Sequence, residues 1–370
     1  MIRLASRNLF QNKVRLMIST GGVALALLLI LALDAIFTGV EQRITAYIDY
    51  AGADIWVSQS DVFNMHMASS SLPDSVARKV KLVAGVASVS PILYVANNVI
   101  VGDERNLAYI IGLPERAEFG GPWNVSAGLN LPREGEAIMD RSVAEKSGVR
   151  LGDTVEILGD ELEVVGLTEG TSSLVNSIAF ISQEDFEAAR GNYDTFSFLL
   201  VKVREGESPQ KVADRIRARV RDVTVQTREQ FSGQERQVVK DMSTDVVTIM
   251  NLIGFLIGLA VMALTVYTST LSRRREYGML KALGARNRDL YFTVLAQAVL
   301  SVLLGFLFGW AITWLLTLSI RFTDMALSLV VSPISLVKVG AVSLLLAGFA
   351  AMIPIRQIAG LDPAMVFRGK

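Results

Sequence analysis

The chain has 370 residues, and although 51% of them are hydrophobic, its 36 basic and 36 acidic residues cancel. A mean hydropathy of +0.41 combined with this many charges indicates a membrane domain joined to a hydrated domain. The chain has no cysteine, which excludes a disulfide framework and a thiolate metal site.

Four apolar stretches are long enough to cross a bilayer. Their uncharged runs contain 18, 27, 31 and 17 residues. As helices these runs measure about 27, 40, 46 and 26 Å, against a hydrocarbon core of about 30 Å. We expect transmembrane helices at 16–37, 246–272, 290–320 and 336–355. The predicted fold class is an α-helical membrane protein in which one helix, a large external domain (38–245) and three further helices follow in that order.

The short segments beside these helices indicate the orientation. Segments 1–15, 273–289 and 356–370 together hold 13 Lys and Arg against 3 Asp and Glu, whereas 38–245 holds 21 against 31. Basic residues in short loops favour the cytoplasmic side. We therefore expect both termini and the 273–289 loop in the cytoplasm, and 38–245 together with the short loop 321–335 outside.

A cleaved signal peptide is the competing interpretation of the N-terminus, because a basic start followed by an apolar run fits both. The apolar run exceeds the usual 7 to 15 residues, and no small-x-small cleavage pattern follows it before Asp34. We expect the first helix to remain as an anchor.

The external domain has an α+β pattern in which a strand, a helix and a second strand occur twice. Pro91 is expected to interrupt the second strand, and Ser208 precedes a proline at a predicted helix start. The predicted elements are, in order, 54–58, 74–83 and 86–101, then 195–203, 208–220 and 223–227. We expect two related βαβ halves brought together in space.

Between the two halves, glycine-punctuated short strands predict a β-rich insert at about 112–190. The polar segments 38–50 and 228–245 are compatible with helix. They are expected to connect the external domain to the first and second transmembrane helices.

The apolar stretches lack the charges that mark ion paths. Asp34 and Lys338 lie near the outer ends of their helices, where both side chains are able to reach the interface. Nothing in these helices indicates a channel or a proton relay.

The sequence shows no catalytic or nucleotide-binding motif, neither a phosphate loop nor H-E-x-x-H nor G-x-S-x-G. The single histidine, His66, lies between Met65 and Met67, and these three residues could bind a soft metal. The favoured interpretation is an apolar loop, with Phe63, Met65 and Met67 contacting a partner or lipid headgroups. We expect no metal site and no nucleic-acid partner.

The loop after the second transmembrane helix contains a short amphipathic helix. Met279, Leu280 and Leu283 fall on one face, and Gly284 offers a stop. One interpretation is that its arginines only contact anionic headgroups. The alternative is that another protein occupies the Met/Leu face.

At these residues the chain resembles the MacB/FtsX type of ABC-transporter permease, whose cytosolic loop has a pattern like R-x-x-E-[IYF]-G-x-L-[RK]-A-L-G-A. The start (4–15) and the end (355–368, with Asp362-Pro363) also resemble that family. The matching loop positions are Arg273, Glu276, Gly278, Leu280, Lys281, Ala282, Leu283, Gly284 and Ala285.

The resemblance implies a homodimer, or a heterodimer with a similar permease, in a bacterial inner membrane. It also implies a separately encoded ATPase that binds ATP and Mg, and in some members a periplasmic adaptor. The loop would be the coupling helix that docks on the ATPase and transmits its motion to the external domain. The residues expected to couple are Arg273, Arg275, Glu276, Gly278, Met279, Leu280, Lys281, Leu283 and Gly284.

Two other classes stay open. One is a regulator that controls an external enzyme without export, as FtsX-like proteins do, and the other is a membrane-anchored binding or scaffold protein without energy input.

Two packing hypotheses complete the sequence analysis. Gly254-x-x-x-Gly258 and Gly305-x-x-x-Gly309 allow close helix contact, within the chain or in a dimer. Segment 1–15 is expected either to lie along the inner leaflet as a basic amphipathic helix or to extend the first transmembrane helix.

Overall fold

The computed structural model describes residues 13–172, 177–191, 193–320 and 329–360. Much of the expected segments 1–15, 321–335 and 356–370 lies outside these residues. The chain divides into two compact units, Met1–Gly39 with Ser243–Lys370, and Val40–Met242.

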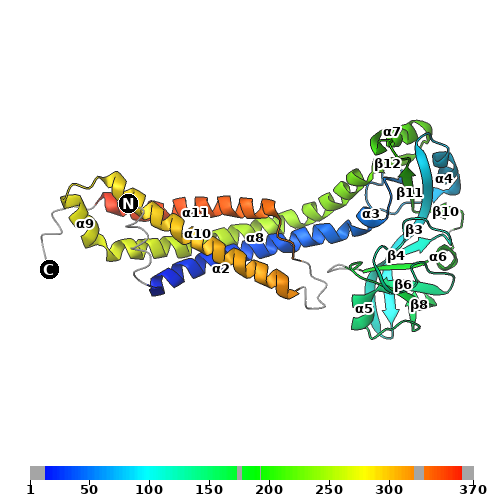
Figure 1. The fold of residues 1–370 in the computed structure, drawn as a ribbon, viewed down its shortest axis with the longest axis horizontal. Helices are drawn as coiled ribbons and strands as arrows, with labels where there is room; N and C mark the ends of the chain where they lie inside the picture. The colour runs from blue at the N-terminus through cyan, green and yellow to red at the C-terminus, as the bar shows by residue number, and fades with distance from the viewer. Residues whose placement is uncertain (1–12, 173–176, 192, 321–328, 361–370) are drawn as a thin grey trace. The chain divides into compact units, whose positions relative to one another are not determined.

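Within the described residues, four helices are long and apolar enough to cross a membrane (Figure 1). They are α2 (Lys13–Ile44), α8 (Arg228–Ser272), α10 (Asn287–Ile320) and α11 (Pro333–Ala359). α2 and α8 continue beyond the expected membrane limits into the second unit, with lengths of 32 and 45 residues. The connectors 38–50 and 228–245 are therefore helical, and α3 (Ala46–Tyr50) directly follows α2.

Glycines of α8 and α10 lie against α2. A Cβ atom added at Gly254 would come within 3.0 Å of a side chain of α2, and one at Gly309 within 3.0 Å of the carbonyl oxygen of Ala24. A Cβ atom would be closer still to a neighbouring side chain at Gly258, 2.9 Å, and at Gly305, 2.6 Å. These four glycines bring helices of one chain together. Their role in a dimer stays a prediction.

The second unit contains a split β-α-β arrangement with the strand order β12-β1-β11-β3, in which every neighbouring pair is antiparallel. Each of the two expected βαβ halves has its strands separated by a strand of the other half, so the halves interleave. The elements are β1 (Ile55–Gln59), α4 (Asp74–Lys81) and β3 (Val86–Val101), then β11 (Phe198–Val203), α7 (Pro209–Arg219) and β12 (Val223–Thr227). A short ribbon of β2 (Leu72–Pro73) and β10 (Thr195–Phe196) accompanies them.

The expected interruption at Pro91 is wrong, because β3 runs through it for 16 residues. Pro91 lies opposite Leu199 of β11, while pairing with β4 on the other side begins only at Leu93. One edge of β3 is therefore unpaired at Pro91, and a residue without an N–H group is tolerated there.

The insert is a continuation of the same sheet, in the order β3-β4-β9-β6-β8-β5, with β7 pairing β3 and β8. It begins earlier than the expected boundary at about 112, because Leu93–Val101 of β3 and all of β4 belong to it. Its elements are β4 (Glu104–Leu113), β5 (Val125–Gly128), β6 (Glu136–Asp140), α5 (Arg141–Lys146), β7 (Thr154–Ile157), β8 (Asp160–Thr168), β9 (Ser177–Ser182) and α6 (Gln183–Arg190).

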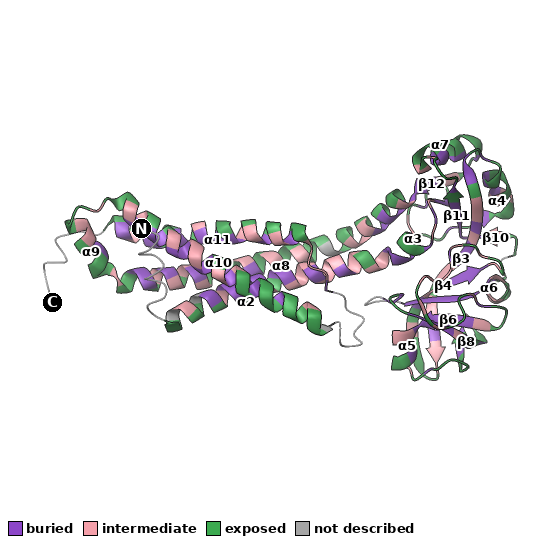
Figure 2. Cartoon of the chain, viewed as in Figure 1, coloured by how far each residue is buried: buried purple, intermediate pink, exposed green. Residues whose placement is uncertain are grey.

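The alternation of side chains along β1 separates two cores in the second unit. Ile55 and Val57 join a cluster that contains the buried faces of α4 and α7. Trp56 belongs to a second cluster, where it stacks on Phe231 of α8 with ring centroids 4.9 Å apart. The buried band along the strands in Figure 2 reflects this packing. The start of α8 is thereby fixed to the sheet.

Candidate functional site

The loop after the second long helix folds as predicted into a short helix, α9 (Arg274–Ala282). Gly284 has a φ of +94°, and the backbone N–H of Ala285 donates to the carbonyl oxygen of Leu280 at 2.9 Å. This six-to-one hydrogen bond with a left-handed glycine is a Schellman termination. Gly284 therefore ends α9.

The apolar face of α9 is divided in the structure. Tyr277 is 2% exposed in the core of the helical unit, and Leu280 packs partly against that core. Met279 and Leu283 are 55% and 80% exposed. The expected continuous stripe of three residues is therefore a pair, Met279 and Leu283, while Leu280 turns inward with Tyr277.

Some charged side chains of this loop have partners within the chain. The side chain of Arg273 is only 11% exposed and lies 3.3 Å from Glu276. Lys281 Nζ donates to the backbone oxygens of Ile358 and Ala359, at 3.4 and 3.2 Å. Gly278 is buried, whereas Arg275 is exposed. Lys281 thus connects α9 to α11, whereas the pair of Arg273 and Glu276 lies within the first turn of α9.

Among the described residues of the helical unit, five buried polar side-chain atoms lack a hydrogen-bond partner, and two of them lie near the contact between Ile30 and Gly254. Asp34 Oδ2 in α2 and Asn251 Oδ1 in α8 are both buried without a hydrogen bond. They lie one helical turn beyond the contact between Ile30 and Gly254, so they are at similar levels on the two helices. Lys338 is exposed. The expectation that both charged groups reach the interface stays a prediction, and Asp34 Oδ2 is buried within the helical unit.

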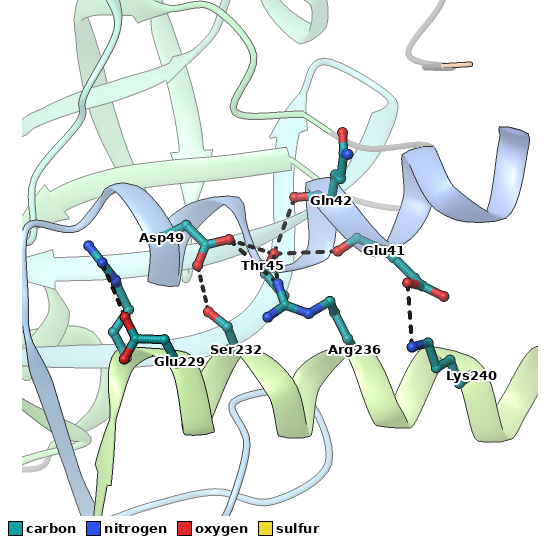
Figure 3. Close-up of polar contacts among 9 residues, drawn as sticks. Glu41, Gln42, Thr45, Asp49, Glu229, Ser232, Arg236 and Lys240 are labelled. Atoms are coloured by element: carbon teal, nitrogen blue, oxygen red, sulfur yellow. Dashed lines mark hydrogen bonds and ion pairs between the residues drawn. The ribbon is translucent and has the colours of Figure 1, made fainter. Parts of the chain in front are cut away.

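Within the second unit, the ends of α2 and α3 are joined to the start of α8 by polar contacts (Figure 3). Asp49 accepts hydrogen bonds from Ser232 at 2.6 Å and from Thr45 at 2.8 Å. Arg236 Nη1 lies 3.5 Å from Thr45 Oγ1 and 3.9 Å from Asp49, and a Lys240–Glu41 ion pair of 3.9 Å adds to the set. We call these side chains the stalk clasp.

The deepest charge in the second unit is Glu235 of α8, which is 0% exposed. Its carboxylate accepts the backbone N–H of Met65 and pairs with His66 Nδ1. The His66 ring packs edge-on against Tyr109, with centroids 4.6 Å apart, and its Nε2 is buried without a partner. Glu235 thereby fixes the loop that follows β1.

The expectation that Met65 contacts a partner or lipid is wrong, since Met65 is 5% exposed. Phe63 and Met67 of the same loop are 47% and 65% exposed. Their contact with a partner or lipid stays a prediction. Among the described residues no cluster of three or more His, Asp or Glu side chains is able to hold a metal ion.

A hollow with about 420 Å³ of atom-free space, part of it open to solvent, lies beside His66. Aromatic and aliphatic side chains line most of it, with Arg43, His66, Thr171 and Ser172 as the polar exceptions. Burial raises the pKa of Tyr94 at its wall, and the neighbouring Tyr109 and Glu235 raise it further.

Arg43 connects the end of α2 to the insert. It donates to the carbonyl oxygen of Ser172 at 2.5 Å. Burial lowers the pKa of Arg43, and the nearby Asp140 opposes that shift. Asp140 caps α5 through the N–H of Ser142 and accepts two hydrogen bonds from Thr171. The α2 helix and the α8 helix therefore attach to different parts of the same unit.

Glu235 and Arg43 were not among the residues expected to be functional. Both lie in segments that were expected to be polar, helix-compatible connectors. The signal available in the sequence was the four-residue spacing of Phe231 and Glu235, which places the carboxylate on the buried face of α8.

Comparison with known families covers most of the chain. The MacB-like periplasmic core domain matches residues 16–219. The FtsX-like permease C-terminal domain matches residues 248–363.

Relatives of similar length also exist. An uncharacterised ABC transporter permease of Mycobacterium tuberculosis is 23% identical over 375 residues, covering 100% of both chains. Another, from Methanocaldococcus jannaschii, is 26% identical over 234 residues, 60% of this chain and 58% of that one. The crystal structure of the periplasmic region of MacB from Actinobacillus actinomycetemcomitans aligns with 52% of this chain and 94% of its own, at 14% identity and a TM-score of 0.38.

Proposed function

Because the chain belongs to the MacB/FtsX type of ABC-transporter permease, we propose that it transmits the ATP-driven motion of a separate ATPase to its external domain. The observation that carries this proposal is the exposed pair Met279 and Leu283, 55% and 80% exposed on a helix whose other face is anchored. Two large apolar side chains on an anchored helix provide a rigid apolar contact for a partner.

In this proposal α9 and both termini face the cytoplasm of a bacterial inner membrane, and residues 38–245 lie outside. The basic excess in the short segments supports this orientation. ATP and Mg would be bound by the ATPase, since the sequence has no phosphate loop. The permease itself would be non-catalytic and act as a homodimer or a heterodimer.

The stalk clasp and Glu235 support a mechanical role for the external domain. α2 and α8 both continue from the helical unit, and each ends in buried or partly buried polar contacts with the second unit. Movement of either helix would then act on a defined part of that unit. The work performed there would be export or extraction of a substrate, with or without a periplasmic adaptor.

An FtsX-like regulator of an external enzyme is the second candidate, and the exposed Phe63 and Met67 favour it as a contact surface. A scaffold without energy input is the third. It would leave Met279 and Leu283 without a partner.

The test is to replace Met279 and Leu283 with Asp and purify the chain from native membranes. We expect loss of the co-purifying ATPase with normal expression, because two charges would be buried in the contact. Leu82→Asp is the matched control, since Leu82 is 74% exposed in the external domain. An ATPase that still co-purifies with the double variant and retains normal turnover would contradict the proposal.

A further inference from the structure

The carboxyl end of α11 lies beside α9, although the two helices are separated in the chain by all of α10. Lys281 Nζ of α9 is 3.4 Å from the carbonyl oxygen of Ile358 and 3.2 Å from that of Ala359. Both acceptors belong to the last turn of α11. A side chain of the loop therefore caps the end of the fourth long helix.

The last carbonyl groups of a helix have no partner within it, and they carry a partial negative charge. In α11 the N–H of Gly360 donates a hydrogen bond to the carbonyl oxygen of Ile358. Pro354, one turn earlier, has no N–H group and interrupts the backbone hydrogen bonds of the helix. A lysine ammonium has three N–H donors and a positive charge, so it suits these terminal oxygens. The contact is thus favourable in hydrogen bonding and in electrostatics.

Apolar packing strengthens the same connection. Tyr277 of α9 and Ile358 of α11 are 2% and 0% exposed in one hydrophobic cluster. Leu280 and Ile355 pack against that cluster. Burial raises the pKa of Tyr277, which keeps its phenol neutral there. Residues of α9 and of the carboxyl end of α11 therefore share one apolar cluster, whereas Met279 and Leu283 are exposed.

We propose that Lys281 is a positioning residue that makes α9 and the carboxyl end of α11 move together. This inference rests on the proposed function, in which α9 receives motion from an ATPase. The motion then reaches α11 directly, besides passing through α8 and α10, which are joined to α9 by the chain. In this role Lys281 acts through α11 and does not itself contact the ATPase.

The test uses the full chain, and its lack of cysteine allows a single probe. Arg356 of α11 is exposed, so Arg356→Cys reports on this helix through its rate of reaction with a water-soluble maleimide. The rate is measured in nanodiscs with the ATPase that co-purifies with the unmodified chain, with and without a non-hydrolysable ATP analogue. Lys281→Met keeps a long apolar side chain but removes the ammonium. Arg288→Met, an exposed position of the same loop, is the control.

We expect Lys281→Met to retain the ATPase but to reduce the nucleotide-dependent ratio of labelling rates to about one. Lys281→Arg and Arg288→Met should keep the ratio of the parent. In a Lys281→Cys variant that keeps Arg356, the cysteine at 281 is the only thiol. Its aminoethylation restores an ammonium group in a chain that has already folded. This modification should restore ATP turnover coupled to the permease.

An unchanged labelling ratio in Lys281→Met would overturn the inference, as would loss of the ATPase from that variant, which would make Lys281 a docking contact. Failure of aminoethylation to restore coupling would also count against it. If the unmodified chain carries no ATPase at all, the proposed function fails, and this inference fails with it.

Discussion

Replacement of Glu235 with Leu should strongly destabilise the external domain. Glu235 is 0% exposed, and it accepts hydrogen bonds from the backbone of Met65 and from His66. Leucine would leave two buried donors without a partner, at about 1 to 3 kcal/mol each. For the two donors together we expect a loss of about 2 to 6 kcal/mol.

The double variant His66→Phe with Glu235→Leu distinguishes the cost of unpaired hydrogen-bond donors from the cost of lost packing. Phenylalanine removes one orphaned donor and preserves an aromatic ring against Tyr109, whereas the N–H of Met65 stays unpaired. The double variant should therefore recover about 1 to 3 kcal/mol relative to Glu235→Leu. Glu229→Leu is the control for Glu235→Leu, because the side chain of Glu229 is 72% exposed on the same helix. The control should change stability by less than about 1 kcal/mol.

Native-state hydrogen exchange of the full chain in nanodiscs measures these changes. The amides of β1 lie between β11 and β12, and their exchange requires the sheet to open. A Glu235→Leu chain whose β1 opening free energy lies within about 1 kcal/mol of the parent would refute the reasoning, as would a double variant that is no more stable than Glu235→Leu.

Two further predictions concern packing and pH. Gly309→Ala should reduce the free energy of unfolding by about 1 to 3 kcal/mol, because the new Cβ would lie 3.0 Å from the backbone oxygen of Ala24. The midpoint of thermal unfolding should fall accordingly. Gly348→Ala, with nothing within 4 Å, should not lower it, and an equal fall in both variants would contradict the packing argument. Burial raises the pKa of Tyr47 above the ordinary 10.0, so the folded chain keeps a proton that the unfolded chain releases. The free energy of unfolding should therefore fall as the pH rises above about 10, by up to about 1.4 kcal/mol per pH unit for this tyrosine. In alkaline unfolding titrations, Tyr47→Phe should reduce that slope.

The parts of the fold that depend on local sequence were predictable. The long uncharged runs indicate the four long helices, although α2 and α8 continue beyond the runs. The proline after Ser208 marks the start of α7, and the glycine at 284 marks the end of α9. The twofold strand–helix–strand pattern also predicted the paired βαβ halves. Pro91 misled because its effect depends on whether a neighbouring strand is present at that edge.

The candidate sites depend on residues distant in sequence, and their details were not predictable. Lys281 donates to backbone oxygens of α11 that are 77 and 78 residues away, and Leu280 packs against a cluster that includes residues of α11. Glu235 lies in a polar stretch typical of a solvated helix, and its partner His66 is 169 residues distant. Periodicity identifies a face of a helix, but it does not identify what covers that face.

The buried pair of Glu235 and His66 is difficult to explain by stability alone. A well-packed apolar pair in the same volume is often as stable as a buried ion pair or more stable. A buried carboxylate does, however, disfavour alternative registers, because any shift of α8 by one residue would rotate the carboxylate by about 100° and leave it buried without its donors. The same carboxylate therefore fixes the rotation of the start of α8 within the second unit. In the proposed function, a helix start fixed in this way would move the loop of Met65 when it turns instead of slipping past it.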